Sequence, residues 1–195
     1  MELTKDQQQA IISFEEFLHS SKQVFILKGS AGTGKTTLLR KLISLLAETD
    51  GAQYNVQLMA PTGRAAMILS DNVGIQAMTI HRTIYDFDAD LSHDETDGKM
   101  HFSLRENVDS RNTIYFVDES SMLSDSENDA FRFGSGFLLH DLLTYCTGRK
   151  IVFVGDNAQL PPVNQSYSPA LSMDILSRQY GVTAQAITLQ QVVRQ

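Results

Sequence analysis

The chain has 195 residues and a mass of 21.7 kDa, which is most simply one domain with a full hydrophobic core. Its net charge of −7 and pI near 5.1 exclude a surface coated with phosphate-binding lysines, so any nucleic-acid contact must lie in a local groove. No apolar run approaches the length of a membrane span, and the first residues lack the basic and apolar parts of a signal peptide. We therefore expect no membrane partner and a cytoplasmic protein.

The single cysteine, Cys146, cannot form an internal disulfide and follows an apolar helical pattern. We expect it to be a small buried hydrophobic residue rather than a catalytic thiol.

Helical and strand patterns alternate along the chain. A capping box at Thr4 and Gln7 predicts a first helix over 5–19. Strands are predicted at 23–28, 56–60, 113–117, 150–154 and 184–189, and further helices at 35–48, 63–69, from about 80, 137–145 and 171–180. The segment 86–112 is the least structured, with a short exposed strand or hairpin at 100–104. The pattern predicts an α/β fold, a mostly parallel sheet sandwiched between helices, with ligands at the carboxyl ends of the strands.

A glycine-rich stretch follows the first strand and fits the phosphate-loop pattern G-x-x-x-x-G-K-[ST]. Its residues, extended by one threonine, are Gly29, Ser30, Ala31, Gly32, Thr33, Gly34, Lys35, Thr36 and Thr37. Glycines let successive backbone N–H groups point at an anion, at the positive end of the next helix. Lys35 would reach the β- and γ-phosphates of ATP, and Thr36 would bind Mg²⁺. A turn that binds nothing is the alternative, but it would not need the Lys35–Thr36 pair.

Two further polar stretches follow buried strands. Asp118 at the end of a strand would hold Mg²⁺ opposite Thr36, and Glu119 would take a proton from the water that attacks the γ-phosphate. The alternative is an acidic helix cap. The stretch GDNAQLPPV over 155–163 would hold Gln159 at a fixed distance from the γ-phosphate, or else is only a turn with a rigid exit.

These three stretches resemble motifs I, II and III of superfamily 1 DNA helicases, because GSAGTGKTT, DESSM and GDNAQLPP occur in that order. The resemblance is greatest to the RecD-like branch, which moves 5′ to 3′ and includes the alpha subunit of exonuclease V. It implies the N-terminal RecA-like domain of a phosphate-loop NTPase over 1–195. A second RecA-like domain with motifs V and VI would follow in a longer protein.

The resemblance also assigns roles to residues outside these motifs. Gln7 matches the N-terminal glutamine that contacts the adenine edge, although closing the capping box is an alternative role. Pro61 and Thr62 match motif Ia, and Thr79 and His81 match motif Ib, both of which contact single-stranded DNA.

Two regions depart from a simple match. Arg194 stands in a motif IV match and would be an arginine finger toward the γ-phosphate, or else an exposed residue at a frayed end. The segment 86–112 takes the place of the family's small inserted domain with its strand-separating pin. It is short and acidic, and Phe102 is its one obvious wedge candidate.

Two functions of different classes follow. The first is the ATP-binding motor domain of a DNA helicase, which would couple hydrolysis to translocation only in the intact two-domain protein. The second is a nucleotide-gated binding module with a vestigial ATPase, which would recruit a DNA-processing partner such as a nuclease. A phosphate-loop kinase is disfavoured by the GDNAQLPPV string.

Overall fold

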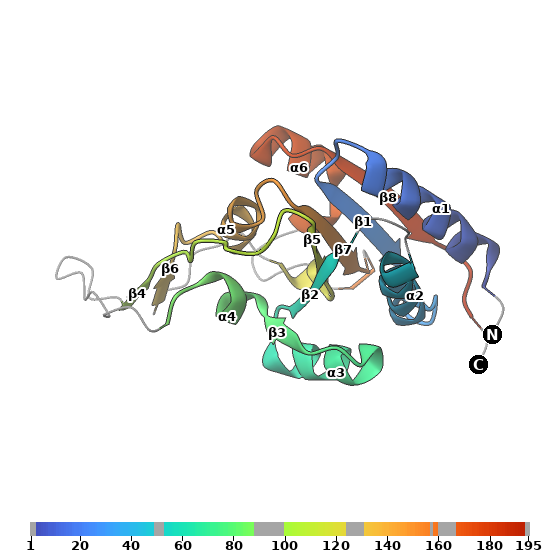
Figure 1. Ribbon diagram of the computed structural model, residues 1–195, viewed down its shortest axis with the longest axis horizontal. Coiled ribbons are helices and arrows are strands. Elements are labelled where there is room, and N and C mark those ends of the chain that lie inside the picture. Colours follow the sequence, from blue (N-terminus) through green and yellow to red (C-terminus); the bar gives the residue numbers. More distant parts are fainter. Residues whose placement is uncertain are drawn as a thin grey trace.

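The computed structural model describes residues 3–48, 53–87, 100–123, 131–156, 158–159 and 167–193. Its central sheet has six parallel strands in the order β3-β2-β5-β7-β1-β8 (Figure 1). The strands are β1 (Val24–Gly29), β2 (Asn55–Ala60), β3 (Ala77–Thr79), β5 (Thr113–Val117), β7 (Lys150–Gly155) and β8 (Ala184–Leu189). The predicted fold class, a mostly parallel sheet between helices, is confirmed.

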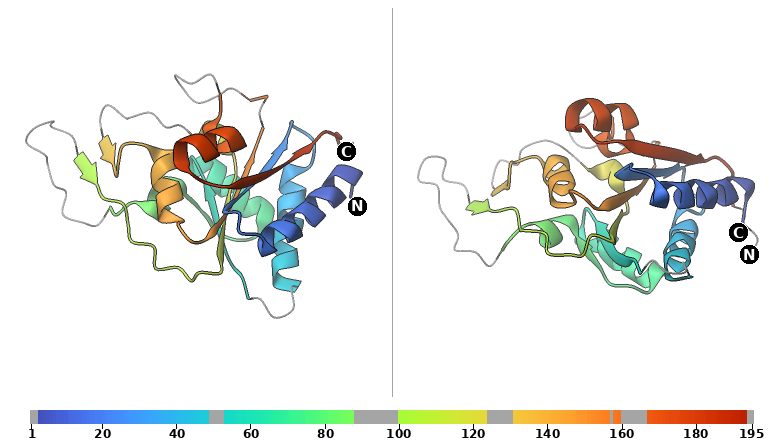
Figure 2. Two further views of the ribbon diagram at one scale, coloured as in Figure 1. Left: turned by 90° about the horizontal axis from the view of Figure 1, so that it is seen from above. Right: turned by 45° about the horizontal axis from the view of Figure 1, so that its top comes forward.

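Helices cover both faces of this sheet (Figures 1 and 2). One face carries α1 (Lys5–His19), α2 (Lys35–Glu48) and α3 (Gly63–Val73). The other carries α4 (Ile80–Ile84), α5 (Leu138–Tyr145) and α6 (Met173–Tyr180). Two short 3-10 turns, η1 (Ser120–Met122) and η2 (Pro169–Leu171), pack against the second face.

The sequence of β1 shows why both faces must be covered. Phe25 and Leu27 point into the core below α1 and α2, whereas Val24 and Ile26 point into the core below α5 and α6, and all four are fully buried. Alternate side chains of a strand point to opposite faces, so a continuous apolar run needs a cover on each.

A two-stranded parallel sheet lies apart from the central one (Figure 1). It pairs β4 (Met100–Phe102) with β6 (Phe131–Phe133). The predicted strand at 100–104 is present as β4, and just after it Leu104 forms an isolated antiparallel bridge with Tyr85. Phe102 is half-buried and stacks on Phe133 with ring centroids 4.9 Å apart, so the predicted wedge candidate is part of a packed aromatic cluster.

The structure corrects the sequence prediction at three elements. The segment before α4, for which no strand was predicted, forms the edge strand β3, because its backbone pairs with β2 over Leu58–Ala60. Helix α3 runs on to Val73, four residues beyond the predicted end, and stops where Gly74 adopts a left-handed conformation. Helix α6 begins at Met173, capped by Ser172, because Pro169 starts the short turn η2 before it.

Candidate nucleotide and DNA site

The phosphate loop joins the carboxyl end of β1 to the first turn of α2. Gly32 and Gly34 have φ angles of 81° and 79°, which residues other than glycine rarely adopt. A Cβ on Gly29 would lie 2.5 Å from the Thr33 hydroxyl, and one on Gly34 would lie 2.5 Å from the Gln7 amide nitrogen. The glycine positions of the motif are therefore required by backbone geometry and by close contacts.

The Lys35 ammonium lies over its own loop. Its Nζ donates to the Gly29 carbonyl at 2.7 Å and to the Ser30 carbonyl at 3.1 Å. Since an ammonium carries three N–H groups, one remains for a phosphate oxygen. Thr36 is half-buried in the first turn of α2, and Thr37 beside it is exposed.

Gln7 connects the first helix to the phosphate loop. Its side-chain oxygen accepts from the Thr4 amide at 3.1 Å, which closes the predicted capping box, and its Nε2 donates to the Thr33 carbonyl at 3.2 Å. Gln7 is only 3% exposed. The capping role is therefore confirmed, and the same side-chain amide lies against the loop, whereas the adenine contact stays a prediction.

Asp118 and Glu119 follow β5, two strands away from β1 in the sheet. Burial raises the pKa of the Asp118 carboxyl, while a hydrogen bond from the Glu119 amide and the nearby Lys35 charge oppose that rise. The amide donates to Asp118 Oδ1 at 2.9 Å. Glu119 has φ 52° and ψ 35°, and it is the one non-glycine residue with positive φ in the described part of the chain.

Gln159 is held next to this pair through Ser121. The Ser121 hydroxyl and Gln159 Oε1 are 2.6 Å apart, and the Ser168 hydroxyl donates to the Ser121 carbonyl at 2.9 Å. On the other side of Gln159, its amide donates to the Asp156 carbonyl at 3.2 Å. Ser121 was not predicted as a site residue, and only its place inside the string DESSM could have indicated it.

A pocket of about 460 Å³ is lined by residues of motif Ia, residues of motif II and Gln159. Asp118, Glu119 and Gln159 line one part, and Thr62, Arg64 and Ile68 of the motif Ia helix line another. The predicted γ-phosphate residues and one predicted DNA contact therefore border the same hollow. Arg64 and Ile68 were not predicted, since an arginine and an isoleucine on an exposed helix carry no signal of their own.

The other predicted DNA residues lie at neighbouring strand ends. Ala60 pairs with Thr79, so Pro61 and Thr62 after β2 lie beside Thr79 at the end of β3. Thr62 accepts from the Ala65 amide and Thr79 from the Arg82 amide, both at 3.2 Å, so each caps a helix. A threonine hydroxyl that accepts in this way keeps its own O–H to donate.

His81 is less suited to a charged phosphate contact than the sequence suggested. Its ring packs 4.9 Å from Phe133 and 5.6 Å from Tyr85, and burial lowers its pKa. The neutral imidazole is therefore favoured at pH 7.

The predicted arginine finger, Arg194, lies outside the described residues. Its predecessor Val193 donates an amide hydrogen bond to the Gly32 carbonyl at 2.9 Å, and Asp6 accepts from the amides of Gln190 and Gln191. The chain therefore runs alongside the phosphate loop up to Val193.

The hard oxygen donors of this site suit Mg²⁺. No group of three or more His, Cys, Asp or Glu side chains suited to a metal occurs in the described ranges. That agrees with the way Mg²⁺ is usually bound beside nucleotides, through phosphate oxygens, water and one or two protein ligands.

The model of the AAA domain family matches residues 2–195. The chain belongs to this family. It is 31% identical to the ATP-dependent RecD2 DNA helicase of Deinococcus radiodurans over 89% of the chain and 20% of that protein. It is also 30% identical to the DNA helicase dda of phage T4, over 87% of the chain and 35% of that protein. It is 32% identical to the DNA helicase PIF1 of Saccharomyces cerevisiae, over 97% of the chain and 21% of that protein.

Solved structures agree with this AAA domain assignment at the level of the fold. A Candida albicans Pif1 helicase aligns over 100% of the chain and 41% of its own length, with TM-score 0.58 and 22% identity. A Bacteroides Pif1 helicase in complex with ADP-AlF3 and single-stranded DNA aligns over 100% of the chain and 43% of its own length, with TM-score 0.56 and 22% identity. The chain is thus homologous to the motor domains of superfamily 1 DNA helicases and spans well under half the length of these relatives.

No helix of the described segments is long and apolar enough to cross a membrane.

Proposed function

We propose that this AAA domain is the ATP-binding motor domain of a DNA helicase of the RecD-like branch, in which ATP hydrolysis drives translocation along single-stranded DNA in the intact protein. The single observation that carries the proposal is the shared pocket of Thr62, Asp118, Glu119 and Gln159. A nucleotide-dependent shift of Gln159 or Glu119 would reach the motif Ia helix directly. The relatives named as DNA helicases support the same assignment.

ATP would bind with its phosphates along the loop between Gly29 and Thr36. The amides at the start of α2 and the remaining Lys35 N–H would hold the β- and γ-phosphates. The Thr36 hydroxyl and the Asp118 carboxylate would hold Mg²⁺, which neutralises charge on the phosphate oxygens when it is bound. Gln7, whose side-chain amide lies against the loop at Thr33, would contact the adenine edge from α1.

Glu119 is the proposed general base of hydrolysis. Its carboxylate would accept a proton from the water that attacks the γ-phosphate in line. Asp118 beside it would stay with the metal, so the two carboxylates have separate tasks. Gln159 would contact the γ-phosphate or the water, held in place by Ser121 at 2.6 Å.

Single-stranded DNA would lie across the ends of β2 and β3. The hydroxyls of Thr62 and Thr79 would donate to successive phosphates. We propose that His81 packs against the aromatic cluster around Phe133 at the end of β6. Any contact of His81 with DNA would be made by its neutral imidazole ring. A nuclease or repair subunit as partner, and Arg194 as an arginine finger, stay predictions.

The test is steady-state ATP turnover by the intact protein, with and without single-stranded DNA. The proposal predicts strong stimulation by single-stranded DNA and weaker stimulation in Thr62→Ala, with Thr144→Ala on the outer face of α5 as the control. Turnover that is absent or indifferent to DNA would contradict the motor assignment and favour the nucleotide-gated binding module.

A further inference from the structure

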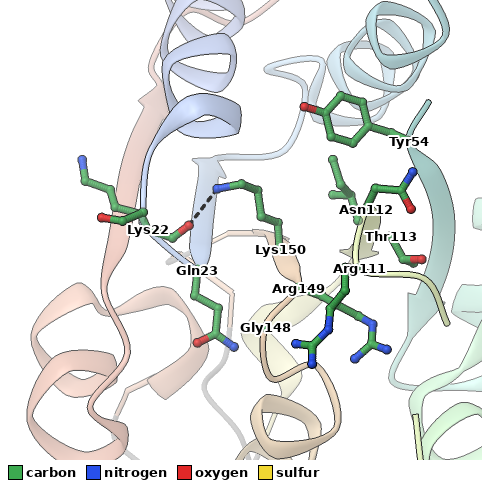
Figure 3. Close-up of a pocket in the computed structure, with 11 residues that line it drawn as sticks. Lys22, Gln23, Tyr54, Arg111, Asn112, Thr113, Gly148, Arg149 and Lys150 are labelled. Carbon is green, nitrogen blue, oxygen red and sulfur yellow. Dashed lines mark hydrogen bonds between the residues drawn. The ribbon is translucent and has the colours of Figure 1, made fainter. Parts of the chain in front are cut away.

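A second pocket lies at the opposite edge of the central sheet from the phosphate loop. It has a volume of about 340 Å³ and is bordered by the residues that begin β1, β5 and β7 (Figure 3). The carboxyl ends of these three strands lead to the phosphate loop, Asp118 and Asp156. Strands of five or six residues separate the two sites by about 15 to 20 Å, at about 3.3 Å per residue.

The lining of this pocket is cationic in a chain whose net charge is −7. Lys22, Arg111, Arg149 and Lys150 border it, and no Asp or Glu does, but the Lys22 ammonium points away and donates to Gln185 Oε1 at 2.8 Å (Figure 3). None of the four forms an ion pair with a carboxylate of a described residue. The lining of this pocket therefore carries positive charge, although the chain as a whole is acidic.

Two of these cations are held by neutral carbonyl groups. Lys150 Nζ donates to the carbonyls of Phe17, Ser20 and Lys22 at 2.9, 3.0 and 3.0 Å. Arg149 donates to the carbonyls of Asn107, Asp109 and Ser110. Carbonyl groups fix the positions of these charges without neutralising them, and they occupy all three N–H groups of Lys150, so these two residues contribute charge rather than free donors.

Arg111 is the exposed cationic side chain of the pocket. Its guanidinium lies directly against Gly148, which has a φ of 74° and no Cβ to displace it. Figure 3 shows the Arg111 and Arg149 guanidinium groups pointing the same way, with the Tyr54 ring on another wall. An anion bound in this pocket would therefore face two positive charges of the same orientation.

We propose that this pocket binds a small phosphate-bearing ligand of about the size of a mononucleotide. The planar donors of Arg111 suit two oxygens of one phosphate. Arg149 and Lys150 supply a fixed positive field, and Tyr54 offers an aromatic wall to an organic ring. The site is separate from the proposed ATP site and does not depend on the proposed function.

The test follows backbone amide shifts of the ¹⁵N-labelled chain during titration with inorganic phosphate and, separately, with AMP. Saturable shifts are expected at the amides of Thr113, Gly148 and Lys150. Arg111→Ala should weaken this binding by roughly tenfold or more, because it removes a charged hydrogen-bond donor. Arg178→Ala is the matched control, since it removes an exposed arginine from α6.

The two probes separate the sources of affinity. Equal affinity for phosphate and AMP would show that the pocket recognises the phosphate group alone. Tighter binding of AMP would show that the organic ring also contributes, through contact with Tyr54. Shifts confined to residues 29–37 would overturn the proposal. Arg111→Ala with the same affinity as Arg178→Ala would overturn it as well.

Discussion

Glu119 shows how a single residue can indicate function through its backbone. A left-handed conformation costs a non-glycine residue about 1 to 3 kcal/mol, and the described chain has this strain at Glu119 alone. A mere helix cap would not need it, because Asp, Asn or Gly would fit that backbone more easily. Glu119 lines the pocket next to Asp118, and we infer that the strained backbone serves to place its carboxylate there.

Lys35 gives the first prediction at this scale. Lys35→Ala removes the side chain that bridges the loop carbonyls and would reach the phosphates, so we expect nucleotide binding to fall by at least about a hundredfold. Titration with a fluorescent ATP analogue measures this loss. Lys41→Ala on the same helix is the control, and unchanged affinity in Lys35→Ala would disprove the phosphate cradle.

His81 gives a pH-dependent prediction. Burial lowers the pKa of His81 below its usual value of 6.5, so the unfolded chain binds more protons than the folded one just below pH 6.5. The free energy of unfolding should therefore fall as the pH drops from 7.5 to 5.5, and fall less in His81→Gln. Urea unfolding at both pH values measures it, with His19→Gln as an exposed control. An identical pH effect in His81→Gln would contradict this account.

At the scale of elements, one buried carboxylate joins three segments. Asp141 on α5 is 2% exposed and accepts from the Tyr85 hydroxyl after α4 at 2.7 Å and from the Ser135 amide after β6 at 3.0 Å. The small sheet of β4 and β6 is thereby attached to the end of α4, the helix that carries His81 of motif Ib.

This attachment predicts a loss of stability in Asp141→Ala. The variant leaves a buried hydroxyl and an amide without their acceptor, which costs about 1 to 3 kcal/mol in free energy of unfolding. Denaturant unfolding measures the cost. Asp174→Ala, which removes an exposed i,i+4 ion pair, should change stability by less than about 0.5 kcal/mol. Equal losses in the two variants would contradict the role of Asp141.

Long elements could be predicted from the sequence because their signals are local. The Thr4–Gln7 capping box fixes the start of α1, and the buried stripe of α2 repeats over 14 residues. Strands β3 and β6 could not be predicted, since three residues show no period and their pairing partners are distant in sequence. In the site, the order of motifs indicated Lys35, Asp118 and Glu119, but only the fold brings Ser121 to Gln159.

At the scale of the whole molecule, a net charge of −7 leaves few cationic contacts for DNA, and we propose that they lie at the strand ends of β2 and β3. If the two exposed arginines next to these strand ends, Arg64 and Arg82, each neutralise one phosphate, affinity for single-stranded DNA should fall roughly tenfold between 50 and 200 mM salt. Fluorescence anisotropy with a labelled oligonucleotide measures the slope. A loss of a thousandfold would require many more cationic contacts than these strand ends provide.

The central claim is that Glu119 acts in hydrolysis and not in nucleotide binding. The most direct measurement is ATP turnover against ATP concentration for the intact protein and its Glu119→Gln variant, with single-stranded DNA present and Glu106→Gln as control. We predict that kcat falls by about a hundredfold or more in Glu119→Gln while KM changes little. A variant that keeps its kcat would contradict the claim and leave the pocket as a nucleotide-gated surface.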